Sequence, residues 1–315
     1  MKEKLKNTGV KVRKKRKRSV NDPNTLFAKV LAVPSLAGVL MFFVVPFIIV
    51  VYYSFVDNPI NKHFVGFENY KMLFKSLAFV RAAKNTAALS FTAVPLAVVL
   101  SLMLAALLDS KIPGKSTLRS FFLSPMMVPV ASVVLIWRVV FAYKGTLNAE
   151  LMKIFEIDDL VKSLGAMPLD WLKSPKCLIV VSLLFLWKNL GYNMVLFLSA
   201  LNNIPKDLLE VAELEGASAL WRMIFIKMRY LSPTVLFVTI LSLINSFKLF
   251  REIYLLTGAN PYEGIYMLQH FMNNTFLTLD YQKLSSAAIV MSIVMVLIIG
   301  ILFTTESLFG HDVEE

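Results

Sequence analysis

Six long apolar stretches constrain the fold of this 315-residue chain more than any other feature. A helix of about 20 consecutive apolar residues crosses a bilayer core. Continuous runs of this length predict helices rather than the alternating strands of a membrane barrel, and a helix satisfies its own backbone hydrogen bonds in lipid. We therefore predict an all-α integral membrane protein. The six predicted transmembrane helices are residues 30–55, 87–108, 121–141, 177–201, 231–250 and 285–303.

The N-terminal tail is strongly basic, because ten of the 33 Lys and Arg residues lie in the first 18 positions. A basic tail directly before an apolar run favours contact with anionic headgroups and retention in the cytoplasm over nucleic-acid binding. The first span is also too long for the h-region of a signal peptide. We expect a basic cytoplasmic tail at residues 1–29, a six-span domain at 30–305 and a short acidic cytoplasmic tail at 306–315. Without the N-terminal tail, the loop charges weakly favour the opposite orientation.

The sequence contains no clear catalytic or metal-binding constellation. One Cys and three His residues leave no disulfide framework and no clustered set of metal ligands. The stretch "IPGKST", residues 112–117, is similar to the end of a phosphate-binding loop, but Asp109 stands where that loop has its first glycine. We expect a non-catalytic membrane subunit without a cofactor, so that any energy comes from another subunit.

Amide side chains inside two predicted spans are the best candidates for ligand contact. Asn189 and Asn193 are one helical turn apart, Tyr192 lies between them, and Asn245 lies in the fifth span. Amides bond paired hydroxyl groups and aromatic rings cover the C–H face of a sugar, so these residues suit a polyhydroxylated ligand. Hydrogen bonding between helices is an equally good explanation of the Asn residues. Gly191 allows a close approach of another helix or a local break.

Charged side chains within the spans give a weaker signal. Lys188 and Arg138 are each close enough to a helix end to extend to the membrane surface. Lys248 and Arg251 are expected near the external interface and not as ligands. No Asp or Glu lies inside the six predicted spans, which counts against a secondary transporter coupled to ions.

A polar segment, residues 207–233, separates two of the most apolar stretches. Lys206 to Glu213 is predicted to form a short amphipathic helix, Gly216 to end it, and residues 217–230 to resume a helix that enters the membrane. With the basic tail in the cytoplasm, this segment is cytoplasmic as well. Its acids would be repelled by anionic lipid, so a protein groove with basic residues is a better partner than the bilayer surface.

This segment resembles the EAA loop of the permease subunits of binding-protein-dependent ABC importers. Glu210-Val211-Ala212, Gly216 and Ile226 fall at the spacing of that loop, whereas Val211 and Met228-Arg229 depart from its Ala and Leu-Pro. The stretches "FVGFENY", residues 64–70, and "FKLFREIYLLTGANP", residues 247–261, are similar to carbohydrate-uptake permeases of the same superfamily, including those for maltose and multiple sugars. Arg251 stands where that family commonly has an acidic residue, so the external end of the pathway is individual to this chain.

The resemblance implies a multi-pass subunit of a prokaryotic cell membrane that imports a sugar or oligosaccharide. Its implied partners are a second permease subunit, two ATP-binding subunits that hold ATP and Mg²⁺, and an extracellular solute-binding protein, besides membrane lipid and with no nucleic acid. Coupling to the ATPases is implied for Glu210, Ala212, Glu213 and Gly216. Glycerol-3-phosphate or another polyol derivative is the alternative substrate, and an autonomous secondary transporter is the alternative mechanism.

Overall fold

The computed structural model describes residues 23–110, 112–154 and 168–310, and the chain folds as two compact units, residues 1–52 and 53–315. The predicted basic tail at 1–29 lies largely outside the described residues, as does half of the acidic tail at 306–315. The described part of the first unit is helical throughout, with one π-helical turn. Its elements are α1 (Pro23–Val39), η1 (Leu40–Val44) and α2 (Val45–Tyr53), whose last residue belongs to the second unit.

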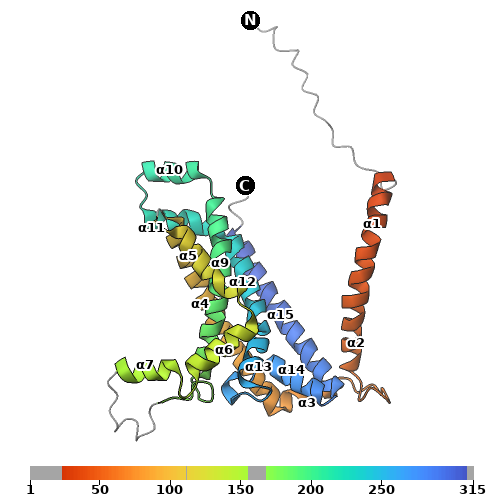
Figure 1. Cartoon of the computed structure of the whole chain (residues 1–315). Coiled ribbons are helices and arrows are strands. Elements are labelled where there is room, and N and C mark those ends of the chain that lie inside the picture. The colour runs from red at the N-terminus through yellow and green to blue at the C-terminus, as the bar shows by residue number, and fades with distance from the viewer. Residues whose placement is uncertain (1–22, 111, 155–167, 311–315) are drawn as a thin grey trace, which may run out of the picture. The chain divides into compact units, whose positions relative to one another are not determined.

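The second unit is a bundle of helices (Figure 1). Its described residues contain no strand beyond an isolated bridge between Val56 and Phe64. The all-α architecture predicted from the apolar runs is therefore confirmed. The elements are α3 (Glu68–Lys75), α4 (Leu77–Asp109), α5 (Lys115–Met127), α6 (Val130–Phe141), α7 (Thr146–Ile154), α9 (Cys177–Asn202), α10 (Lys206–Leu214), α11 (Ala219–Trp221), η2 (Arg222–Lys227), α12 (Met228–Lys248), α13 (Phe250–Thr257), η3 (Glu263–Ile265), α14 (Leu268–Leu277) and α15 (Tyr281–Gly310).

Six helical segments of the described chain are long and apolar enough to cross a membrane, as predicted. Two of them differ from the predicted ranges in an informative way. The third predicted span is interrupted, because α5 ends before Val128 and α6 starts after Pro129, whose fixed φ and missing N–H favour a break. The fifth continues from α12 into α13 and ends only at Thr257. The six segments are residues 31–53, 77–109, 130–154, 177–202, 219–257 and 281–306.

Helices α4, α9 and α12 form the core of the second unit. Phe185 and Phe197 of α9 are fully buried there, with Leu89 of α4 and Leu231 of α12 in the same apolar cluster. Gly191 lies in the middle of α9, where a Cβ atom would be 1.8 Å from the backbone oxygen of Phe122 in α5. The predicted close approach of a second helix at Gly191 is therefore present, and only glycine permits it.

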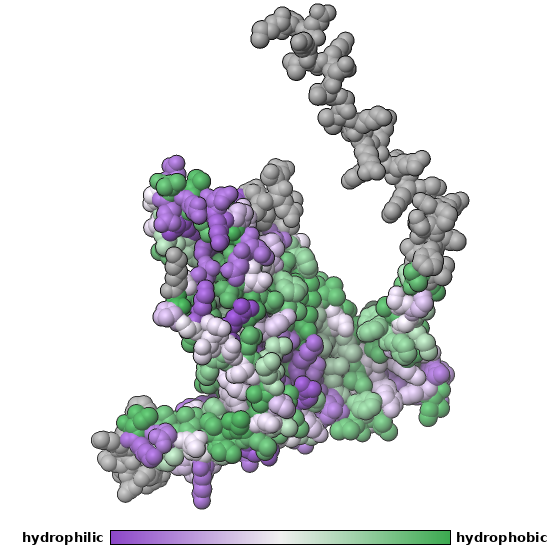
Figure 2. All heavy atoms as spheres, turned by 45° about the horizontal axis from the view of Figure 1, so that its top comes forward, coloured by the Kyte–Doolittle hydropathy of each residue, from purple (hydrophilic) through white to green (hydrophobic). Residues whose placement is uncertain are grey.

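The two ends of the second unit differ in chemistry. Helices α10 and α11 lie at one end, together with the C-terminal end of α15, whereas α3, α7 and α14 lie at the other (Figure 1). In Figure 2, hydrophilic residues gather at the end that carries α10 and α11, next to largely apolar sides. This distribution fits a bundle whose sides face lipid.

Side-chain hydrogen bonds organise the end opposite α10. The buried Asn69 of α3 donates to the backbone oxygens of Ser54 and Val56, at 3.0 and 2.9 Å, and so fastens the loop after the first span. In α14, the fully buried His270 accepts a hydrogen bond at Nδ1 from the N–H of Met267, and its ring lies 4.7 Å from the ring of Phe250. Burial lowers the pKa of His270 from 6.5 to about 4, because the charged ring loses its hydration.

Candidate functional site

Helix α10 is the amphipathic helix expected after the fourth span, and a glycine motif ends it. The N–H of Gly216 donates to the oxygen of Glu213 at 3.0 Å, and the N–H of Ala217 donates to the oxygen of Ala212 at 2.9 Å. This pair of bonds is a Schellman motif, which needs a left-handed residue after the helix. Gly216 has a φ of +85°, so the role predicted for it as a helix stop is confirmed.

The surface of α10 is exposed on both its acidic and its apolar sides. None of its residues is buried, Glu210 and Glu213 face solvent, and Ala212 is half-buried. Val211 is 59% exposed and Leu214 is 87% exposed, so apolar side chains lie uncovered at the hydrophilic end of the bundle. Exposed apolar residues among acids are typical of a surface that another protein covers.

Two charged contacts involve the α10 segment, residues 206–227, one within the segment and one to α4. Arg222 in η2 forms an ion pair with Glu213 and donates to the backbone oxygen of Leu209 at 3.5 Å, so it holds α10 against the start of the fifth span. Lys227 at the end of η2 donates to Asp109 at the end of α4, at 2.5 Å. Segment η2 therefore contacts α10 through Arg222 and α4 through Lys227.

A polar cavity of about 390 Å³ lies between α9 and the α12–α13 pair, and Met126 of α5 also borders it. Its volume is within the usual range for small-molecule sites. Three residues predicted as pathway residues line it: Asn189, Tyr192 and Asn245. The sequence pattern therefore identified part of a real cavity.

The amides of this cavity are oriented by one another. The Nδ2 atom of Asn245 donates to Oδ1 of Asn189 at 3.0 Å, while Nδ2 of Asn189 donates to the backbone oxygen of Phe185 at 2.8 Å. Among the described residues, Oδ1 of Asn245 and the hydroxyl of Tyr192 have no hydrogen-bond partner. These two polar atoms are available to hydroxyl groups of a ligand.

Asn193 lies outside this cavity. It is fully buried, and its Nδ2 atom donates to Oγ of Ser242 in α12 at 2.8 Å. The structure therefore separates the two Asn residues of α9: Asn189 borders the cavity, and Asn193 bonds to a neighbouring helix.

The charges around the cavity are arranged differently from what the sequence suggested. Lys188 forms an ion pair with Glu252 of α13. The helix of the fifth span continues past Phe250 to Thr257, and Glu252 is buried in this continuation, two residues beyond the predicted end of the span. Lys248 and Arg251, not expected as ligands, also line the cavity. Arg138, by contrast, donates to the backbone oxygen of Leu256 at 3.1 Å.

Glu252 was missed because the fifth span was predicted to end at Phe250. The signal that could have found it is the continued helical spacing of Glu252, Ile253 and Leu256, all of which are buried in α13. The ion pair joins residues 64 positions apart, which no local pattern reveals.

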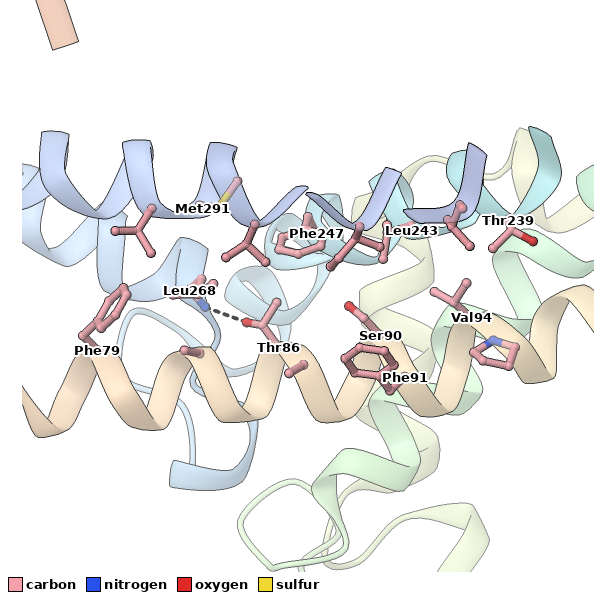
Figure 3. A pocket seen from close by; sticks show the side chains of 17 residues that line it. Phe79, Thr86, Ser90, Phe91, Val94, Thr239, Leu243, Phe247, Leu268 and Met291 are labelled. Carbon is pink, nitrogen blue, oxygen red and sulfur yellow. Dashed lines mark hydrogen bonds between the residues drawn. The ribbon is translucent and has the colours of Figure 1, made fainter. Parts of the chain in front are cut away.

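A second hollow, of about 370 Å³, lies between α4, α12 and α15 and is almost entirely apolar. Phe79, Phe91 and Met291 line it (Figure 3), and Oγ1 of Thr86 accepts a hydrogen bond from the N–H of Leu268 at 2.9 Å. Ser90 is bonded to Ser246 at 2.8 Å. With its few hydroxyls already bonded, this hollow offers little to a polar ligand.

Comparison with known proteins identifies the protein family. A family described as the inner membrane component of binding-protein-dependent transport systems matches residues 97–307, which include the α10 segment and the polar cavity. The chain belongs to this family. It is a multi-pass inner-membrane transport subunit and not an enzyme, and the resemblance found in the sequence is confirmed.

Curated relatives of this permease extend over most of its length. It is 28% identical to the trehalose/maltose transport system permease protein MalF of Thermococcus litoralis, over 90% of this chain and 94% of the relative. It is 29% identical to the lactose transport system permease protein LacF of Rhizobium radiobacter, over 76% of this chain and 78% of the relative. It is also 28% identical to the multiple sugar-binding permease protein MsmF of Streptococcus mutans, over 84% and 89%.

A solved structure supports the fold. A chain of a bacterial ABC transporter involved in the import of alginate aligns with a TM-score of 0.74 at 17% identity, over 93% of this permease and 97% of that chain. At this identity the likeness concerns the arrangement of the helices.

Proposed function

We propose that this permease forms the translocation pathway of an ATP-driven importer for a sugar or oligosaccharide. The cavity between α9 and α12–α13 carries the proposal, because Asn189, Asn245 and Tyr192 place amide and hydroxyl groups inside a membrane bundle. Such groups exchange hydrogen bonds with a polyhydroxylated substrate, which would otherwise lose its hydration in the membrane. Relatives named for trehalose/maltose, lactose and multiple sugars support the same substrate class.

One observation favours the alternative substrate, glycerol-3-phosphate or another polyol derivative. A relative at 28% identity is the sn-glycerol-3-phosphate permease protein UgpA of Pectobacterium atrosepticum. Lys248 and Arg251 border the cavity and would suit a phosphate group. An autonomous secondary transporter is a weaker alternative, since it leaves the exposed surface of α10 without a purpose.

Helix α10 serves as the docking element for the ATPases in this proposal. Glu210, Glu213 and Ala212 supply the acidic and apolar surface, and Gly216 fixes the turn that presents it. Closure of the ATPase pair on ATP would move α10, and the Arg222 and Lys227 ion pairs would pass that motion to the membrane helices. ATP and Mg²⁺ are bound by the ATPases, and a second permease and a solute-binding protein complete the importer.

The orientation follows from the same proposal. With α10 on the ATPase side after the fourth of six spans, the number of spans puts both chain termini in the cytoplasm, and α3, α7 and α14 face outward. The basic N-terminal tail would then meet the anionic inner leaflet, which supports this orientation.

Co-purification from native membranes in mild detergent tests the proposal. We expect the intact chain to bring down a second permease and an ATPase, and Glu210→Lys to lose the ATPase but keep the permease. Glu150→Lys is the matched control, because Glu150 is an exposed acid at the opposite end of the bundle. Recovery of the intact chain alone, still transporting in proteoliposomes without ATP, would contradict the importer and favour the secondary carrier.

A further inference from the structure

We propose that the polar cavity selects a carbohydrate that bears an acidic group: a carboxylate, a phosphate or a sulfonate. The inference rests on the proposed import function and adds the charge of the substrate to it. It depends on four charged side chains that border one cavity, three cationic and one anionic: Lys188, Lys248, Arg251 and Glu252.

The cavity carries an excess of positive charge. Lys188 forms an ion pair with Glu252, so these two side chains largely neutralise each other. Within the described residues, Lys248 and Arg251 take part in no ion pair and no side-chain hydrogen bond. Two cations are therefore left without a counter-charge beside the amides of Asn189 and Asn245.

The two uncompensated cations lie close together. Lys248 is the last residue of α12 and Arg251 is the second residue of α13, with Leu249 between the helices in a helical conformation. A spacing of three residues puts side chains on the same face of a helix, where like charges repel each other. An anion between them would replace this repulsion with attraction to both.

Their exposure makes these cations suitable for ligand binding. Both Lys248 and Arg251 are exposed, whereas Glu252 is only 4% exposed and is occupied by Lys188. A ligand entering the cavity therefore meets free cations and a carboxylate that is already neutralised. The guanidinium group of Arg251 can bond an oxyanion through two parallel N–H groups, which adds geometric selection to charge attraction.

A neutral sugar would use only part of this cavity. Its hydroxyls can bond Asn245 and Tyr192 and can accept from Lys248 and Arg251, but they leave the two positive charges without a counter-charge. An acidic sugar satisfies both sets of groups at once. The cavity thus discriminates between a charged sugar and a neutral one of the same shape.

Binding to the purified importer, with its own partner subunits and without the solute-binding protein, tests the inference. Omission of the binding protein removes its selectivity from the result. One pair of probes is trigalacturonic acid and its trimethyl ester, and the other is glycerol-3-phosphate and glycerol. We expect at least one acidic probe to bind about tenfold more tightly than its neutral counterpart, as a charge-assisted hydrogen bond implies.

Variants then locate the discrimination. Lys248→Gln and Arg251→Gln are each expected to remove part of this tenfold preference for the acid, with little change for the neutral probe. Lys84→Gln is the control, because Lys84 is an exposed cation of α4 that does not border the cavity.

Two results would overturn the inference. If no acidic probe binds better than its neutral counterpart, the cavity does not select charge, while ATP-dependent sugar uptake with co-purifying ATPase would leave the proposed function in place. The second result is that Lys248→Gln and Arg251→Gln release the second permease and leave the preference for the acidic probe unchanged. The two cations would then bind the second permease and not the substrate. Loss of ATP dependence in the intact importer would refute the proposed function separately.

Discussion

The Nζ atom of Lys227 donates a hydrogen bond of 2.5 Å to the carboxylate of Asp109 and joins the entrance of the fifth span to the end of α4. Both side chains are 22% exposed, so the pair is partly shielded from water. We predict that Asp109→Asn lowers sugar uptake by the assembled importer more than its ATPase rate, because motion of α10 is no longer passed to α4. We also expect the free energy of unfolding to fall by about 1 to 2 kcal/mol.

The charge-swapped double variant Asp109→Lys with Lys227→Asp should recover part of the uptake. Glu150→Gln, which breaks an exposed pair with Lys153, should change neither quantity, because such pairs contribute little. Uptake and ATPase activity that fall in parallel in Asp109→Asn would argue against a coupling role for this ion pair.

Gly216→Pro should abolish uptake while the chain stays in the membrane with its second permease. The φ of +85° at this position is closed to proline, whose ring fixes φ near −65°, and the variant loses the N–H that bonds Glu213. Gly216→Asn is the comparison, since Asn tolerates the left-handed conformation better than other residues. Uptake of radiolabelled sugar into membrane vesicles measures both, and unimpaired uptake by the proline variant would refute the docking role of α10.

Gly191→Ala should destabilise the permease strongly. The added Cβ atom would lie 1.8 Å from the Phe122 oxygen, so α5 and α9 would have to separate. Overpacking of this kind costs about 1 to 3 kcal/mol or more. Gly300→Ala in α15 has no atom within 4 Å of the new methyl group and should leave the melting temperature in detergent unchanged or raise it slightly. Equal melting temperatures for the two variants would contradict the close contact.

His270 should make stability depend on pH. Its pKa is about 4 in the folded protein and 6.5 ordinarily, so between these values the unfolded chain binds more protons. The stabilising contribution of the neutral ring is therefore complete above pH 6.5 and is lost as the pH falls through about 4. We expect the melting temperature to drop between pH 7.5 and 5, and to drop less in His270→Phe. His63→Gln is the control, because His63 is exposed; an identical drop in His270→Phe would exclude His270 as the cause.

Substitution of the two Asn residues of α9 should distinguish an effect on ligand binding from an effect on helix packing. Asn189→Ala is expected to raise the KM for uptake several-fold with a small effect on stability, since Asn189 orients the amide of Asn245 at the cavity. Asn193→Ala is expected to lower the melting temperature, because it removes the hydrogen bond to Ser242. A changed substrate preference in Asn193→Ala, with unchanged stability, would return Asn193 to the pathway.

Local features of the chain were predictable from the sequence. The six spans could be predicted from the apolar runs, because a helix in lipid satisfies its own backbone hydrogen bonds regardless of which helices surround it. Helix α10 and its stop at Gly216 were equally accessible, since a helix signal and a glycine depend on adjacent residues only. The interruption near Pro129 was not foreseen, because proline is also tolerated within membrane helices.

Contacts between distant helices could not be predicted in the same way. A spacing of four residues suggested that Asn189 and Asn193 share a face, yet at 3.6 residues per turn they are about 40° apart, enough to direct them to different neighbours. The pairing of Lys188 with Glu252 depends on where the fifth span ends and on which helix packs against α9. Neither is specified by a single stretch of sequence.

The contact of α9 with α5 at Gly191 has a mechanical consequence. Because the two backbones touch near the middle of α9, with no side chain between them, neither helix can slide past the other without a steric clash. The cavity residue Asn189 lies half a turn before this point, and α10 follows the end of α9 directly. Helices α5 and α9 are therefore expected to move as one rigid unit, which carries Asn189 of the polar cavity and continues into α10.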